Sequence, residues 1–288
     1  MESVLIFSSQ QREQIRGQLV SAAKTDSRIV GAAHLGSAAL GLEDRWSDID
    51  LALGLAPNAD LNEVLVDWTR HLYRDHAAVA TCDVRRGNIL YRVFLLDNTL
   101  QIDLSFWPST ELRAIGPKFQ LIFGAAANPM PSPVLDSRDL IGMAWLYALH
   151  VRSSIERSRL LQAEHMLSGM RDNVLALVCM RHGVPAVQGR GLDDLPEDQR
   201  RQAAESLARS LEPVELTRAF RVTMRNLVEE VGCADADLAT KLEGPLNRIV
   251  SCLANSTNDD WRAWLDGVLT EGIDSLEVYC ENAISCCR

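Results

Sequence analysis

An alternation of acidic and apolar residues over positions 48–55 constrains the fold of this chain more than any other feature. The segment reads Asp-Ile-Asp-Leu-Ala-Leu-Gly-Leu, and a period of two is typical of a β-strand. Because successive side chains of a strand point to opposite faces, Asp48 and Asp50 share one face while Ile49 and Leu51 turn toward the core. Adjacent carboxylates repel each other unless a cation lies between them. The segment therefore predicts a strand that presents a cation-binding pair.

A further carboxylate, Asp103, stands in the strand-like run Leu-Gln-Ile-Asp-Leu-Ser-Phe over 100–106. A lone charge on an otherwise apolar strand is unfavourable, so we expect Asp103 to lie beside the strand of Asp48 and Asp50. Mg²⁺ prefers oxygen ligands and is bound by carboxylates together with substrate phosphates. Such a cluster around a pair of ions fits a site that activates a hydroxyl and neutralises a leaving pyrophosphate.

Gly36 and Ser37 precede the acidic strand and follow a small, apolar run that suits a buried strand. Glycine lets a backbone approach a phosphate closely, and amides at a helix start attract anions. Taken singly, Gly-Ser is an ordinary turn and Asp-x-Asp an ordinary solvated strand face. Their occurrence in this order, with Asp103 on a later strand, favours a phosphoryl-transfer site. Trp46, just before the acidic strand, is expected to pack under its loop, with stacking on a base as the alternative.

The periodicity predicts an α+β chain, in which a mixed β-sheet domain with flanking helices is followed by an all-helical domain. Helices are expected over 9–23 and 60–73, and strands over 28–35, 48–55, 78–84, 89–96, 100–106 and 119–123. Helical spacing resumes over 139–157, 160–182, 197–211 and 215–231, and again from Leu238 and from Trp261. The Pro-rich stretch between them predicts a domain at 1–125, a linker at 126–137 and a helical domain at 138–288.

The composition of the chain limits the kinds of partner that we expect it to bind. The formal net charge is −10, which argues against a nucleic-acid partner, because such proteins usually carry a basic surface. We expect no membrane partner, since no apolar run is long enough to span a bilayer, and the N-terminus does not resemble a signal peptide. The 7 cysteines are odd in number and scattered, including Cys280, Cys286 and Cys287, which fits free thiols in a reducing cytoplasm. We therefore expect a cytoplasmic protein, either monomeric or homodimeric.

Gly36-Ser37, then Trp-Ser-Asp-Ile-Asp-Leu at 46–51, then Gln-Ile-Asp at 101–103, resembles the polymerase β-like nucleotidyltransferase superfamily. The resemblance covers roughly residues 10 to 125. It implies that Asp48, Asp50 and Asp103 are catalytic and bind two Mg²⁺ ions. It also implies that Gly36, Ser37 and Ser47 bind the nucleoside triphosphate. The chain is thus expected to be an ATP-binding transferase of the nucleotidyltransferase class.

The helical half resembles, in architecture alone, antibiotic nucleotidyltransferases that act on aminoglycosides or lincosamides. Two features are candidates for acceptor binding: a polar helix face with Glu164, Arg171 and Asp172, and Arg190 in a Gly-rich loop. An intrahelical ion network is the simpler interpretation of the helix face, and a plain loop ending in a helix N-cap explains the Gly-rich segment nearly as well.

The resulting hypothesis is transfer of AMP from ATP to a hydroxyl of a small molecule, an antibiotic-resistance activity, with release of pyrophosphate. The alternatives are nucleotidylation of a protein or RNA, as in toxin–antitoxin systems, and a non-catalytic nucleotide-binding protein.

Overall fold

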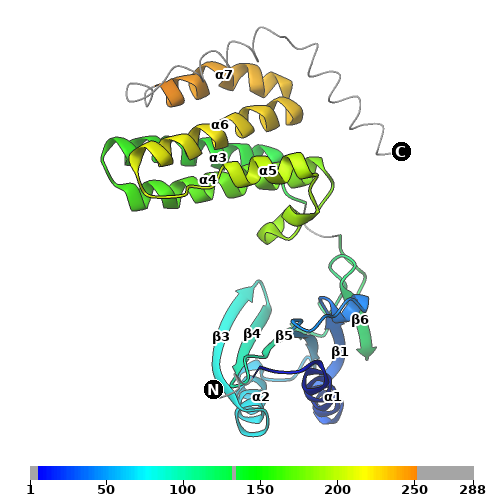
Figure 1. The fold of residues 1–288 in the computed structure, drawn as a ribbon. Coiled ribbons are helices and arrows are strands. Elements are labelled where there is room, and N and C mark those ends of the chain that lie inside the picture. The colour runs from blue at the N-terminus through cyan, green and yellow to red at the C-terminus, as the bar shows by residue number, and fades with distance from the viewer. Residues whose placement is uncertain (1–5, 132–133, 252–288) are drawn as a thin grey trace, which may run out of the picture. The chain divides into compact units, whose positions relative to one another are not determined.

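A computed structural model of the chain describes residues 6–131 and 134–251 (Figure 1). It forms two compact units, which meet in sequence at residues 133 and 134, inside the stretch predicted as a linker. Each unit has its own hydrophobic core and is described by itself. The helix expected from Trp261 and the cysteines at 280, 286 and 287 lie outside the described residues.

The N-terminal unit is built on a mixed 6-stranded sheet with the order β3-β4-β5-β2-β1-β6. β2 and β5 pair in parallel, whereas the other neighbours are antiparallel. The strands are β1 (Ile29–Leu35), β2 (Ile49–Leu55), β3 (Ala78–Arg86), β4 (Ile89–Leu96), β5 (Gln101–Pro108) and β6 (Phe119–Phe123). The helices are α1 (Ser9–Thr25) and α2 (Leu61–Asp75), with a short 3-10 turn, η1 (Ala38–Leu40).

The two faces of the sheet differ in what covers them. Ile49, Leu51 and Leu53 of β2 and the alternate residues of β5 join α1 and α2 in the main core of the unit. The opposite face carries a smaller cluster that includes Ala52 and Trp107. Asp50 and Asp103 follow the same alternation as Ala52 and Trp107, so they project from the face that α1 and α2 do not cover.

α1 and α2 begin where their sequences supply a cap. Ser8 accepts a hydrogen bond from the Gln11 amide while the Gln11 side chain accepts one from the Ser8 amide, which is a capping box. Asp60 accepts hydrogen bonds from the amides of Asn62 and Glu63 and starts α2 in the same manner. These caps fix the helices that flank the sheet.

The second unit is helical in its described part and contains α3 (Ser137–Glu156), α4 (Leu160–Arg181), α5 (Glu197–Glu205), α6 (Pro213–Ala234) and α7 (Ala236–Ser251). Two 3-10 turns, η2 (Val187–Gly189) and η3 (Leu192–Asp194), precede α5. Apolar residues of α3, α4, α6 and α7 share one core. The α+β architecture expected from the sequence is confirmed.

Several boundaries differ from the prediction by one to three residues, and two differences matter to the argument. α5 ends at Glu205, six residues short of the predicted end at 211. Arginine side chains bind the carbonyl groups at its end: Arg218 donates to Glu205 O at 2.7 Å and Leu207 O at 2.8 Å. Tertiary contacts thus override a sequence with good helix propensity. The second difference is that Asp48 lies just before β2, which begins at Ile49.

None of the described helices is long and apolar enough to cross a membrane.

Candidate active site

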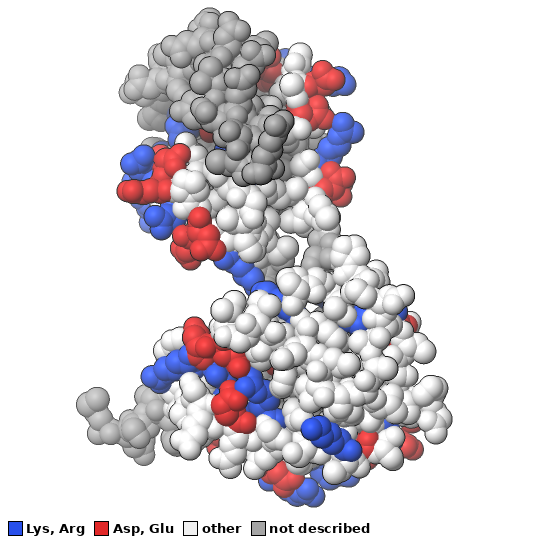
Figure 2. Space-filling view, turned by 90° about the vertical axis from the view of Figure 1, so that its right-hand side faces the viewer, with Lys and Arg blue, Asp and Glu red and all other residues white. Residues whose placement is uncertain are grey.

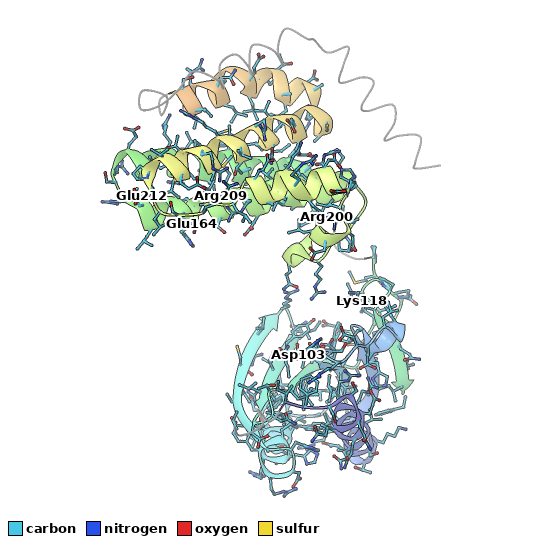
Figure 3. All side chains as sticks on the ribbon, in the orientation of Figure 1. Asp103, Lys118, Glu164, Arg200, Arg209 and Glu212 are labelled. Atoms are coloured by element: carbon cyan, nitrogen blue, oxygen red, sulfur yellow. The ribbon has the colours of Figure 1, made fainter. Side chains whose placement is uncertain are left out.

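Asp48, Asp50 and Asp103 converge. Each offers a carboxylate oxygen, and these atoms all lie within 4.8 Å of one another. The parallel pairing of β2 and β5 produces this arrangement, because Asp50 and Asp103 are Cα partners in the ladder. Asp103 projects from the sheet of the N-terminal unit (Figure 3). The register thus joins carboxylates that are 53 positions apart in the sequence.

Gly36 lies directly against the carboxylate of Asp50. Its φ of +60° lies in the left-handed region, where a side chain is strained. A Cβ atom at this position would lie 2.1 Å from Asp50 Oδ2, well inside van der Waals contact. The structure therefore favours a glycine at position 36 for two separate reasons. The second reason, the seating of the Asp50 carboxylate, is not visible in the sequence.

Gln101 links two of the carboxylates. Its side-chain amide donates to Asp103 Oδ1 at 2.9 Å and lies 3.5 Å from Asp48 Oδ2. Gln101 precedes Asp103 by two residues on β5 and therefore shares its face. Among the described residues, neither Asp48 nor Asp103 forms an ion pair with Lys or Arg. Sequence reasoning gave Gln101 no role, although its period-two spacing from Asp103 was the signal that could have revealed one.

The environment of Asp103 makes ionisation less favourable. Burial raises the pKa of the Asp103 carboxyl above its ordinary value, and the nearby charge of Asp48 adds to the rise, while the hydrogen bond from Gln101 opposes it. A carboxyl that is poorly solvated and beside another carboxylate stands to gain from a bound cation. The ionised Asp103 carboxylate therefore lowers the stability of the metal-free protein at neutral pH.

We predict that Asp103→Asn raises the melting temperature at neutral pH in buffer without divalent cations. Because the folded-state pKa of Asp103 is raised, the folded protein holds this proton more firmly than the unfolded chain does. Ionisation of Asp103 therefore lowers the stability of the wild type as pH rises from the ordinary pKa of Asp through the raised value, and the variant lacks this contribution. Differential scanning fluorimetry from about pH 3.5 to about pH 8 would measure the melting temperature of the wild type and of the variant as a function of pH. A variant less stable than the wild type at neutral pH would refute the prediction.

The donor set fits a hard divalent cation. Carboxylate oxygens are the ligands that Mg²⁺ and Mn²⁺ favour, and the spacing of these atoms lets Asp48, Asp50 and Asp103 reach a common ion. The raised pKa of Asp103 and the close approach of Asp48 agree with a cation at this point. The geometry does not resemble a zinc site, because no Cys or His of the described residues belongs to the cluster.

Ser37 and Ser47, which are also predicted to bind the nucleotide, lie in two different turns. Ser37 caps η1, and its carbonyl accepts from Leu40 and Leu42, so the expected helix start is only a short 3-10 turn. The Ser47 hydroxyl accepts from the Asp44 amide and donates to Asp44 Oδ1, so it stabilises its own turn. Contact of either serine with a nucleotide stays a prediction. The expected packing of Trp46 is wrong, since its side chain is 66% exposed with Arg45 stacked over the ring.

The residues predicted to bind the acceptor lie in the helical unit. Arg171 is buried and donates to Ser206 O at 3.3 Å. It lies 3.8 Å from Glu164, which Figure 3 labels on the helical unit. This placement fits the intrahelical network that was the simpler interpretation of that helix face. Asp172 and Arg190 are exposed. An acceptor-binding role for these residues stays a prediction.

Comparison with known proteins gives no family model that matches the chain. No curated protein matches it either. Among solved structures, an aminoglycoside 6-adenyltransferase from Bacillus subtilis is similar at 13% identity and a TM-score of 0.36, over 85% of this chain and 99% of that one. The polymerase core of TRAMP, an RNA surveillance complex, is similar at 15% identity and a TM-score of 0.27, over 76% of this chain and 60% of that one. The GLD-2/RNP-8 complex is similar at 13% identity and a TM-score of 0.27, over 64% of this chain and 45% of that one.

TM-scores this low do not by themselves assign an activity. The carboxylate geometry and the sequence motif that produces it are the features that point to an activity.

Proposed function

We propose that this chain is a Mg²⁺-dependent nucleotidyltransferase that transfers AMP from ATP to a hydroxyl of a small molecule. The observation that carries the proposal is the convergence of Asp48, Asp50 and Asp103 on the sheet face that α1 and α2 leave uncovered. The motif Gly-Ser, Asp-x-Asp and a later Asp, which resembles the polymerase β-like superfamily, supports the same reading.

The residues have distinct proposed tasks. Asp48, Asp50 and Asp103 would hold the metal, which would supply charge neutralisation of the triphosphate and of the departing pyrophosphate. Gly36 leaves room for the Asp50 carboxylate and gives the backbone close access to a phosphate. Asp103, which β5 places beside Asp50, is the carboxylate that we propose accepts the proton of the acceptor hydroxyl.

The reaction follows from these tasks. The acceptor oxygen bonds to the α-phosphorus as the bond from that phosphorus to the bridging oxygen breaks. Pyrophosphate leaves with the electron pair of the broken bond, and the hydroxyl proton passes to the carboxylate. The contribution of the protein is mainly to position the reactants and to neutralise charge.

A cationic acceptor suits the charge of the chain. The net charge of −10 would attract an aminoglycoside and repel a nucleic-acid backbone. On the face shown in Figure 2, basic and acidic side chains lie beside one another with wide uncharged areas between them, instead of forming a continuous basic surface. These features support a small cationic acceptor over RNA.

The test is a transfer assay read by mass spectrometry. The protein is incubated with each nucleoside triphosphate and Mg²⁺, in separate reactions with an aminoglycoside panel, a lincosamide panel, bulk RNA and a protein lysate. A nucleotidyl addition to an antibiotic, largest with ATP, supports the proposal. Addition only to RNA or to a protein would overturn the proposal that the acceptor is a small molecule. No addition to any acceptor and no exchange of labelled pyrophosphate into ATP would overturn the activity.

A further inference from the structure

We propose that Arg12 is a positioning residue that anchors the turn leading into Asp48 and so holds this carboxylate against Asp50 and Asp103. The proposal rests on the proposed metal site, because it assigns Arg12 a task in forming it. Arg12 comes from α1, which carries none of the clustered carboxylates. No sequence pattern connects this arginine with the acidic motif more than thirty positions later.

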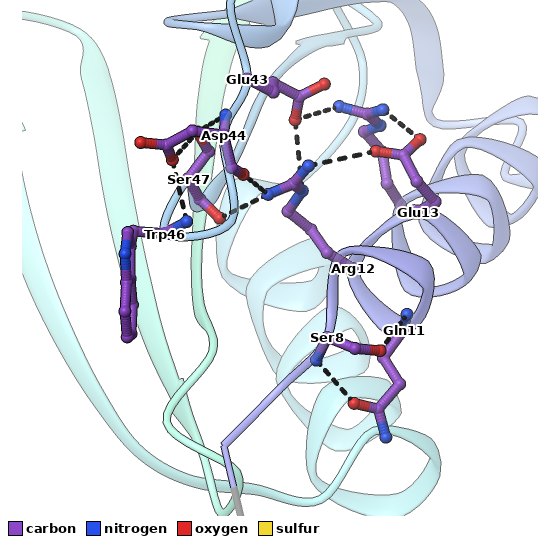
Figure 4. Close-up of polar contacts among 9 residues, drawn as sticks. Ser8, Gln11, Arg12, Glu13, Glu43, Asp44, Trp46 and Ser47 are labelled. Carbon is purple, nitrogen blue, oxygen red and sulfur yellow. Dashed lines mark hydrogen bonds and ion pairs between the residues drawn. The ribbon is translucent and has the colours of Figure 1, made fainter.

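The contacts of Arg12 are with the backbone of that turn. Nη1 donates to the carbonyl oxygen of Asp44 at 2.5 Å and to that of Ser47 at 3.3 Å (Figure 4). One guanidinium nitrogen therefore binds both ends of the Asp44–Ser47 turn. Ser47 immediately precedes Asp48, so the second contact fixes the chain one residue before the carboxylate.

The guanidinium is itself held in place. The Arg12 side chain is only 5% exposed, Nε lies 3.3 Å from Glu43 Oε1, and Nη2 lies 3.6 Å from Glu13 Oε1. Arg16 pairs with the same two glutamates, and its Nη1 lies 2.6 Å from Glu43 Oε1. A buried arginine that is paired on several sides has little freedom to move. The turn is thus bound to a fixed point on α1.

The turn is also ordered from within. Asp44 Oδ1 accepts hydrogen bonds from the Trp46 amide at 2.8 Å and from the Ser47 hydroxyl at 3.0 Å. The Asp44 amide in turn donates to Ser47 Oγ at 2.9 Å. These bonds give the turn its shape, but they do not tie it to the rest of the unit. The contacts from Arg12 supply that attachment.

Asp48 needs such an attachment more than Asp50 does. The register of β2 with β5 starts at Ile49, so the ladder fixes Asp50 directly and Asp48 only through its neighbour. The contact of Asp48 with Gln101 is long, at 3.5 Å. Loss of Arg12 would therefore release Asp48 while leaving Asp50 and Asp103 in the sheet.

The test compares Arg12→Gln with Arg16→Gln as the matched control. Arg16 lies on the same helix and pairs with the same glutamates, but its hydrogen bonds go to Glu43 and Glu13 and not to the turn carbonyls. Hydrogen exchange of peptides covering residues 41–48 is measured first, with peptides of β4 and β5 as the internal check on folding. We expect faster exchange over 41–48 in Arg12→Gln alone, with β4 and β5 unchanged.

The second readout is Mn²⁺ binding, followed by electron paramagnetic resonance. Residues that orient metal ligands typically change metal affinity by about 10-fold to 100-fold, so we expect a loss of that size in Arg12→Gln and none in Arg16→Gln. Arg12→Lys retains a donor for the carbonyls and is expected to fall between the wild type and Arg12→Gln. In the transfer assay, excess Mn²⁺ should restore the turnover number of Arg12→Gln, with the acceptor KM unchanged.

The outcomes separate this inference from the proposed activity. Equal exchange over 41–48 in Arg12→Gln and Arg16→Gln would overturn the positioning role, whatever the wild type transfers. Slower or equal exchange together with full Mn²⁺ affinity would do the same. If Arg12→Gln frees the turn but the wild type transfers no nucleotide, the positioning role stands and the proposed reaction falls.

Discussion

Asp50→Asn is expected to lower the rate of nucleotide transfer by roughly 10²- to 10³-fold, the size found when one preorganised electrostatic group is removed from an active site. Asp50 is the central carboxylate of the cluster, since it is paired with Asp103 in the sheet and seated over Gly36. Asparagine keeps the shape of the side chain and removes its charge. The loss should therefore appear in the turnover number, with the melting temperature close to that of the wild type.

Asp67→Asn is the control for Asp50→Asn. Asp67 lies on α2 with 48% of its side chain exposed and pairs with arginines at the surface. Removal of such a surface charge costs about 1 kcal/mol or less and should leave the transfer rate unchanged. Steady-state rates at saturating ATP and Mg²⁺ give the comparison. Equal rates for Asp50→Asn and the wild type would rule out a catalytic role for the carboxylate cluster.

Gly36→Ala is expected to disable the site through a single methyl group. The added Cβ would lie 2.1 Å from Asp50 Oδ2, so the carboxylate must move by an ångström or so. A misplacement of about 1 Å in a reacting constellation can lower the rate by about 10²-fold. We expect a loss of that size in transfer and a parallel loss of Mn²⁺ affinity.

Gly41→Ala separates the clash from backbone strain. Gly41 has a φ of +65°, close to the +60° of Gly36, but a Cβ there would meet no other atom within 4 Å. Both variants should lose about 1–2 kcal/mol of unfolding free energy from the left-handed backbone, as measured by urea denaturation. Only Gly36→Ala should lose transfer activity. If both variants lose activity equally, the close contact between Gly36 and the Asp50 carboxylate does not contribute to activity.

The secondary structure of the N-terminal unit could be predicted because its signals are local. The alternation in 48–55 and around Asp103 gives strands, and the same period puts Asp50 and Asp103 on defined faces. The order of the strands is a different matter, since pairing between β2 and β5 depends on contacts distant in sequence. The end of α5 was missed because Arg218, thirteen residues beyond it, binds its terminal carbonyl.

Only the acidic residues of the site could be predicted from the sequence. Asp48, Asp50 and Asp103 carry a pattern, whereas Gln101 acts through a neutral amide and Arg12 through backbone carbonyls, which leave no motif. The exposure of Trp46 and the burial of Arg171 were likewise invisible, because helical and turn periodicity does not say which polar face is covered. The acceptor class therefore stays a proposal that rests on charge and resemblance.

The most direct measurement is a crystal structure of the protein with Mn²⁺ and a non-hydrolysable ATP analogue, with anomalous differences collected at the manganese edge. The account predicts anomalous peaks within coordination distance of carboxylate oxygens of Asp48, Asp50 and Asp103, as a pair roughly 3.5–4 Å apart that contacts the phosphates of the analogue. Peaks elsewhere in the molecule, with no manganese at these carboxylates, would contradict it.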